Sequence, residues 1–96
     1  MPPAMIAALI RRGDAMMEIG DISAARLLYE RAAAANSGAA ALAVGRTYDP
    51  AFLERAGARG LRGDPAAAAT WYRRALALGE TQAEPLLRGV TAAGRN

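Results

Sequence analysis

The side chains that most often carry catalysis are missing from this chain, which contains no histidine, no cysteine and no lysine. It therefore has no imidazole base, no thiol nucleophile, no amine for a Schiff base and no phosphate-loop lysine. The two serines, Ser23 and Ser37, are better explained as helix caps than as nucleophiles. We therefore expect a protein that is not an enzyme and that binds no cofactor.

The carboxylates offer one arrangement of interest. Asp14 and Glu18 lie four residues apart, which places them on one face of a helix. Two carboxylates alone do not make a site for a hard cation, because such a cation usually takes six or more oxygen ligands. Asp49 and Glu54 occupy positions that are ordinary for a cap and a solvated face. The sequence predicts no metal site.

The positive charges are all arginines, and one group of them falls between positions 55 and 74. Its members are Arg55, Arg59, Arg62, Arg73 and Arg74. Such a cluster is suited to contacts with phosphates, so nucleic-acid binding is one alternative function. Against it, acidic residues (Asp49, Glu54 and Asp64) are interleaved with the arginines, and no exposed aromatic side chain is evident for base stacking. The sequence favours a protein partner over nucleic acid.

With 96 residues and a formal net charge of +3, the chain has room for one small domain. Abundant alanine and few β-branched residues favour an all-helical fold. The longest uncharged run, residues 32–45, is interrupted by Asn36, Ser37 and Gly38, so we expect no membrane span. No basic region precedes the apolar residues 4–10, and two arginines follow them. This order is wrong for a secretory signal and favours a cytoplasmic location.

Cap and turn residues divide the chain into six predicted helices. Their expected ranges are about 4–19, 22–35, 38–47, 51–58, 65–78 and 82–93. The inward-facing residues expected in the fourth helix are Phe52, Leu53 and Ala56. The last helix has two alternative starts, because Thr81 with Glu84 forms a capping-box pattern, whereas Pro85 is suited to the first helical position.

One pattern occurs twice along the chain. The segment at 20–36, GDISAARLLYERAAAAN, matches the segment at 63–79, GDPAAAATWYRRALALG, at an offset of 43 residues. The matched pairs include Gly20 with Gly63, Ala25 with Ala68, Tyr29 with Tyr72, Arg31 with Arg74, and Ala32 with Ala75. These identities at one offset identify an internal repeat. Gly13 lies inside the first helix at a cost of about 1 kcal/mol relative to alanine, and close approach of a second helix is the expected reason for it.

The duplicated pattern resembles the tetratricopeptide repeat, which has a small residue in its first helix, a Gly-Asp turn, and then alanine, an aromatic residue and alanine along its second helix. The second copy has 11 extra residues between its two helices, and in this it is similar to the Sel-one-like subfamily. The residues that carry this similarity are Asp64, Pro65, Ala68, Trp71, Tyr72, Arg74, Ala75 and Gly79. The resemblance implies an all-α fold, a right-handed α-α superhelix of about two repeats plus a C-terminal helix.

The resemblance also implies the organisation of the chain as a single helical-repeat domain, 1–96. Repeat one covers about 5–36, repeat two about 38–79 with an enlarged connection at 49–62, and a C-terminal capping helix about 82–93. Two repeats fall short of the three usually needed for a stable stack. The inserted helix, the C-terminal helix or a dimer interface is expected to supply the missing burial.

By the same resemblance, the chain is expected to be a non-catalytic scaffold that binds a protein or peptide in a groove lined by the first helix of each repeat. The groove residues are Ile10, Asp14 and Met17 in repeat one, and Leu42 and Arg46 in repeat two. A mixed apolar and charged groove suits a peptide with a hydrophobic anchor and one or two charges. The lysine-and-asparagine clamp that some family members use for C-terminal carboxylates is absent. A homodimer formed through the open ends of the stack is a third alternative.

Overall fold

The computed structural model describes residues 1–58 and 60–93, and within these ranges it is all-helical with no strand. The helices are α1 (Pro3–Glu18), α2 (Ile22–Ala33), α3 (Gly38–Tyr48), α4 (Pro50–Arg55), α5 (Pro65–Ala77) and α6 (Ala83–Ala93). The predicted fold class, all-α, is therefore confirmed. The six predicted helices are also present at nearly the expected positions.

Side-chain caps start most of these helices. The carboxylate of Asp21 accepts a hydrogen bond from the backbone N–H of Ala24 (3.1 Å), and Asp64 accepts one from Ala67 (3.0 Å). The hydroxyl oxygen of Ser37 accepts one from Ala40 (3.1 Å). These bonds satisfy backbone N–H groups that have no partner in the first helical turn, which explains why the chain begins a helix at each of these points.

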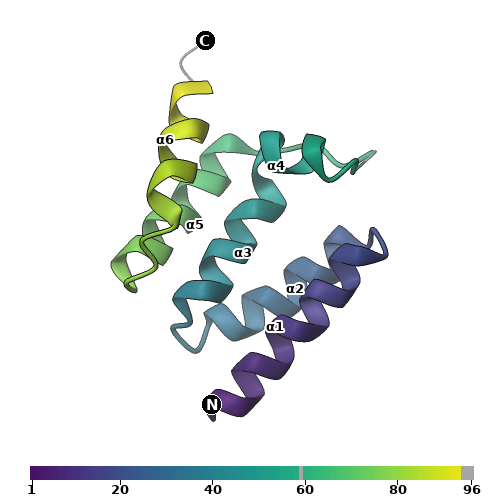
Figure 1. Cartoon of the computed structure of the whole chain (residues 1–96), viewed down its shortest axis with the longest axis vertical. Coiled ribbons are helices and arrows are strands. Elements are labelled where there is room, and N and C mark those ends of the chain that lie inside the picture. The colour runs from purple at the N-terminus through teal and green to yellow at the C-terminus, as the bar shows by residue number, and fades with distance from the viewer. Residues whose placement is uncertain (59, 94–96) are drawn as a thin grey trace.

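Helices that follow one another fold back and pack side by side (Figure 1). Helix α1 packs on α2, α2 on α3, α3 on α5 and α5 on α6, each pair running antiparallel. The short helix α4 lies next to the end of α3. The arrangement is compact, with a radius of gyration of 12.6 Å. Helix α3 is the central element, because it has neighbours on both sides.

The core consists mainly of small side chains, so the helix axes approach one another closely. Its largest fully buried side chains are Tyr72, Val44 and Thr47. The fully buried alanines are Ala25, Ala32, Ala33, Ala40, Ala41, Ala68, Ala75 and Ala83. An alanine core brings little apolar area per residue, so the few large side chains carry a large share of the hydrophobic stabilisation.

The structure corrects the end of the fourth predicted helix and one of the two alternative starts of the last. Helix α4 ends at Arg55 rather than at 58, because Gly57 takes a positive φ of 70° that stops the helix. Helix α6 begins at Ala83, within one residue of the expected start at about 82, so Pro85 is its third residue rather than its first. The N–H groups of the first helical turn have no intrahelical acceptor, and Pro85 therefore removes no hydrogen bond there. No helix in the described part of the chain is long and apolar enough to span a membrane.

Candidate functional site

The two copies of the repeated pattern build the same contact between helices. In α1 and α2 the ring of Tyr29 lies on Gly13, and a Cβ added to Gly13 would lie only 2.5 Å from Cε1 of Tyr29. In α3 and α5 the ring of Tyr72 lies on Gly45, where an added Cβ would lie 2.5 Å from its Cε1. The expectation that a second helix approaches Gly13 closely is confirmed. Each glycine leaves room for a tyrosine ring to pack against helix backbone.

Each of these tyrosines also donates a hydrogen bond to a carboxylate. The hydroxyl of Tyr29 donates to Oδ1 of Asp14 at 2.5 Å, and the hydroxyl of Tyr72 donates to Oδ2 of Asp49 at 2.7 Å. The second bond is buried, and Asp49 is only 5% exposed. The other oxygen of Asp49 accepts from the backbone N–H of Ala51 at 3.0 Å, so this carboxylate also caps α4.

Both phenols are held in their protonated form. Burial, and after it the hydrogen bond to Asp14, raises the pKa of Tyr29 above its ordinary value. Burial and the hydrogen bond to Asp49 raise the pKa of Tyr72 in the same way, while the positive charge of Arg46 acts in the opposite direction on both pKa values. At neutral pH each phenol therefore remains a hydrogen-bond donor to its carboxylate.

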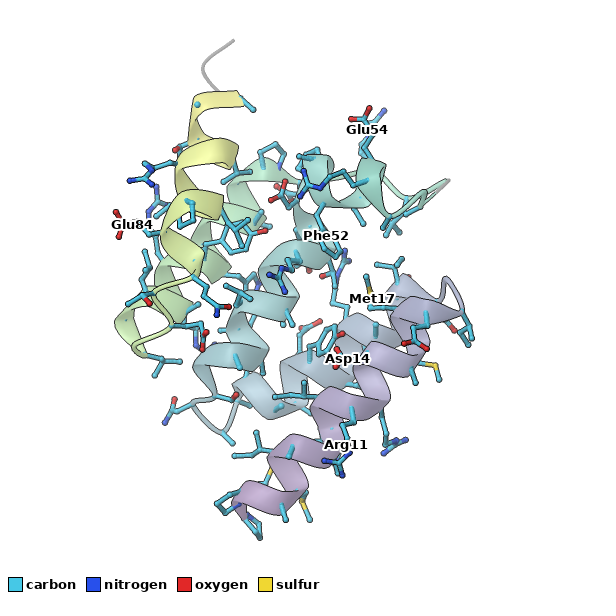
Figure 2. All side chains as sticks on the ribbon, in the orientation of Figure 1. Arg11, Asp14, Met17, Phe52, Glu54 and Glu84 are labelled. Atoms are coloured by element: carbon cyan, nitrogen blue, oxygen red, sulfur yellow. The ribbon has the colours of Figure 1, made fainter. Side chains whose placement is uncertain are left out.

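A groove of about 370 Å³ opens beside these contacts, between α1, α3 and α4. Its lining residues are Asp14, Met17, Glu18, Tyr29, Ala43, Arg46 and Phe52. Figure 2 shows Asp14 and Met17 on α1 and Phe52 on α4 around the same space. Helix α1 supplies two carboxylates to this groove, and α3 supplies one guanidinium, whose carbon lies 5.8 Å from the centre of the Phe52 ring.

The structure brings together three of the five residues that the sequence assigned to a groove. Asp14, Met17 and Arg46 line the same hollow. Ile10 is half-buried and packs against the core instead. Leu42 is 4% exposed and belongs to the core, because α3 is covered by helices on both sides. The expectation that Leu42 is accessible to a ligand therefore does not fit its burial.

Sequence reasoning missed Phe52 as a lining residue. It treated Phe52, Leu53 and Ala56 as one inward face, but only Leu53 is buried, while Phe52 is half-buried at the groove and Ala56 is exposed. The direction of a six-residue helix is set by its attachment at Asp49, and that attachment depends on a contact with α5. Periodicity within α4 contains no signal for it.

The described arginines of the predicted basic cluster have different surroundings. Arg74 donates to the carbonyl oxygen of Ala33 at 3.0 Å, and its guanidinium carbon lies 5.1 Å from the centre of the Trp71 ring. Arg55 lines a separate hollow between α4 and α6, whereas Arg73 lines one between α5 and α6. Arg62 is exposed, and Arg59 lies outside the described residues.

Arg26 links α2 to α3 by hydrogen bonds. Its Nε donates to Oγ1 of Thr47 (2.9 Å), one of its terminal nitrogens donates to the carbonyl oxygen of Thr47 (2.7 Å), and its guanidinium carbon lies 3.7 Å from the centre of the Tyr48 ring. Arg26 on α2 thus holds the last turn of α3, as Arg74 on α5 holds the last turn of α2. Carbonyls at helix ends are favourable partners for cations.

Among the residues that the structure describes, no group of three or more carboxylates, histidines or cysteines gathers in a way that suits a metal ion. Comparison with protein-family models, with curated proteins and with solved structures returns no match. The geometry of the helices and of the groove is therefore the basis for the function that we assign.

Proposed function

We propose that this chain is a tetratricopeptide-like protein of the Sel-one-like type and acts as a non-catalytic module that binds a peptide segment of a partner protein. Two observations support a repeat stack: the duplicated contact of a tyrosine ring on a glycine, and the antiparallel order of the packed helices. In this account α1 with α2 and α3 with α5 are two repeats of a right-handed superhelix, and α6 closes its end.

The ligand site is the groove between α1, α3 and α4. The observation that carries this assignment is the meeting of Asp14, Met17, Arg46 and Phe52 around one hollow of about 370 Å³. The only ion pair recorded within the described ranges joins Arg88 to Glu84 on α6, so Arg46 is not neutralised by a carboxylate across the groove. Its charge is available to a ligand.

The charges of the two walls define the kind of peptide that fits. Asp14 and Glu18 on α1 favour a basic side chain, whereas Arg46 on α3 favours an acidic side chain or a terminal carboxylate. Met17 and Phe52 offer an apolar surface for one hydrophobic anchor. We therefore assign to the groove a short peptide in which a hydrophobic residue lies between one acidic and one basic residue.

Selection from a library of displayed twelve-residue peptides tests this function. Peptides that bind the immobilised chain are synthesised, and their affinities are measured by fluorescence anisotropy for the wild type, Arg46→Glu and Arg55→Glu. We expect Arg46→Glu to weaken binding by about tenfold or more, because it reverses the charge of one groove wall. Arg55→Glu is the matched control, since it makes the same change in the separate hollow between α4 and α6, and it leaves the affinity within about twofold. Equal effects of the two variants would contradict the proposal.

A further inference from the structure

The outer face of the first hairpin, formed by α1 and α2, is hollowed and open to solvent. It contains an apolar hollow of about 420 Å³. Its lining includes Arg12, Ala15, Leu27 and Arg31. The opposite end of the molecule differs, because the exposed side of α6 presents the ion pair between Glu84 and Arg88. Apolar surface is thus concentrated at the first hairpin, where Ile19 and Leu27 are 73% and 67% exposed.

The second helix pair shows what covers this kind of surface. Gly13 and Gly45 correspond at an offset of 32 residues, and Tyr29 and Tyr72 correspond at an offset of 43. On these offsets Ala15 corresponds to Thr47. Thr47 is fully buried, whereas Ala15 is exposed. The face that is open on the first pair is therefore closed on the second pair.

The cover of the second pair is helix α2. It reaches α3 through Arg26, which binds Oγ1 and the carbonyl oxygen of Thr47. At its end it offers the carbonyl oxygen of Ala33 to Arg74 of α5. Arg74 corresponds to Arg31, which is exposed at the edge of the open hollow. Arg74 binds the last residue of α2, the helix that covers the second pair. Arg31 occupies the equivalent position on the first pair.

The arginines on the outer face of α1 and α2 indicate which residues a helix that covers this face would carry in place of those of α2. Arg12 stands where the second pair has the buried Val44, one turn from Ala15. A covering helix with an arginine at the place of Arg26 would bring two like charges together, whereas an acidic residue there would pair with Arg12. A symmetric dimer through this face would bring Arg12 and Arg31 of both copies into one interface, because a two-fold interface uses the same patch on each subunit.

We propose that the outer face of α1 and α2 binds a helix of another protein, the second helix of a helical hairpin that stacks on this chain. The bound helix has small apolar residues along its contacting side and an acidic residue opposite Arg12. Its last turn gives a free carbonyl oxygen to Arg31. This surface is separate from the groove between α1, α3 and α4, so the two sites can be occupied independently.

A fused chain tests the proposal with a defined probe. Residues 1–37 carrying Arg26→Glu are joined directly to residues 6–96, so that Ile6 follows Ser37 as Gly38 does in the natural chain. The probe hairpin is then joined to α1 of the downstream copy by the same connection that joins the first hairpin to α3 in the natural chain. We expect one cooperative urea transition whose slope, m, exceeds that of the natural chain by about one third, because m scales with the surface exposed on unfolding.

Two matched variants of the fusion separate stacking from a change in composition. Ala15→Glu in the downstream copy places a charge in the proposed interface, and it is expected to abolish the gain in m. The same substitution in the upstream copy leaves the charge in solvent and is expected to preserve the gain. A fusion that keeps Arg26 is expected to unfold at a lower urea concentration than the fusion with Arg26→Glu. Identical behaviour of the two Ala15 variants, or two separate transitions in the Arg26→Glu fusion, overturns the proposal.

Sedimentation of the natural chain tests the choice of occupant. We expect a monomer at micromolar concentration, both for the wild type and for Ala15→Glu. A wild-type dimer that Ala15→Glu converts to monomer would show that a second copy covers this face, and it would overturn the assignment to a different protein.

Discussion

The two glycine–tyrosine contacts are alike in their packing and different in their polar partners. In the first pair the carboxylate is Asp14, next to Gly13 in the sequence and exposed to solvent. In the second pair the corresponding position is Arg46, and the carboxylate comes instead from Asp49, which is 5% exposed. The hydroxyls of the two corresponding tyrosines therefore donate to carboxylates at different positions of the two helix pairs.

This difference explains how the inserted helix is held. Asp49 uses one oxygen for Tyr72 and the other for the first turn of α4, so the insertion is anchored to the contact between α3 and α5. In the second pair the carboxylate is at position 49, and position 46, which corresponds to Asp14, is an arginine that lines the groove with Asp14 and Glu18. Asp49 thus anchors α4, and Arg46 gives the groove a positive charge.

The largest difference from the wild type is expected for Tyr72→Ala. The side chain is fully buried and fills the space above Gly45, so its removal leaves a cavity in an alanine-rich core. We expect the free energy of unfolding to fall by about 3–5 kcal/mol in urea titrations followed by circular dichroism. A loss below about 1 kcal/mol would show that the core closes around the missing ring and that the contact is not central to the fold.

Asp49→Ala and Asp14→Ala compare the two carboxylates directly. Asp49→Ala removes the cap of α4 and leaves the buried hydroxyl of Tyr72 without its acceptor, so we expect a loss of about 2–3 kcal/mol. Asp14→Ala is expected to cost about 1 kcal/mol or less, because this site is open to water. Chemical denaturation of the two variants side by side is the measurement. Equal losses would contradict the difference in burial.

The raised pKa values of Tyr29 and Tyr72 predict a loss of stability in alkali. Their contribution is complete below the pKa of an unfolded tyrosine, about 10, and it is lost as the pH rises from there toward the higher folded pKa. We expect the free energy of unfolding at pH 11 to be lower than at pH 8 by about 1 kcal/mol for each phenol. Tyr72→Phe should remove one of these contributions, and an unchanged pH profile in that variant would be the contradicting result.

The smallest effect on stability is expected for Arg46→Glu. Arg46 is only partly buried, and its contact with the ring of Phe52 spans 5.8 Å. We expect its free energy of unfolding to remain within about 0.5–1 kcal/mol of the wild type in urea titrations. A larger loss would show that Arg46 holds the fold together, and its effect on peptide binding would then have a structural cause.

Local signals were enough to predict the helices and one contact between them. Asp21, Ser37 and Asp64 are cap residues whose function depends on neighbours three residues away, so the sequence contains all that is needed to place them. Gly13 was predictable for a related reason, because a glycine inside a helix has a cost that close packing compensates. The confirmed helices rest on information that is local in the sequence.

The missed features depend on residues that are far apart in the sequence. Asp49 meets Tyr72 and Arg26 meets Thr47 only after the helices have packed, and each of these residues has an ordinary local role when it is considered alone. Leu42 was assigned to the groove from its position in a repeat, but α3 is covered on both sides and turns this side chain into the core. Phe52 became a groove residue through the anchoring of α4 at Asp49.

The most direct test of the proposed function is a map of the peptide site by two-dimensional ¹⁵N–¹H NMR. A peptide selected on the immobilised chain is titrated into the labelled protein, and shifts of the backbone amide signals are followed. We expect the largest changes at Asp14, Met17, Arg46 and Phe52, around the groove between α1, α3 and α4. Changes centred on Leu86, Gly89 and Val90, in the hollow between α4 and α6, would contradict it.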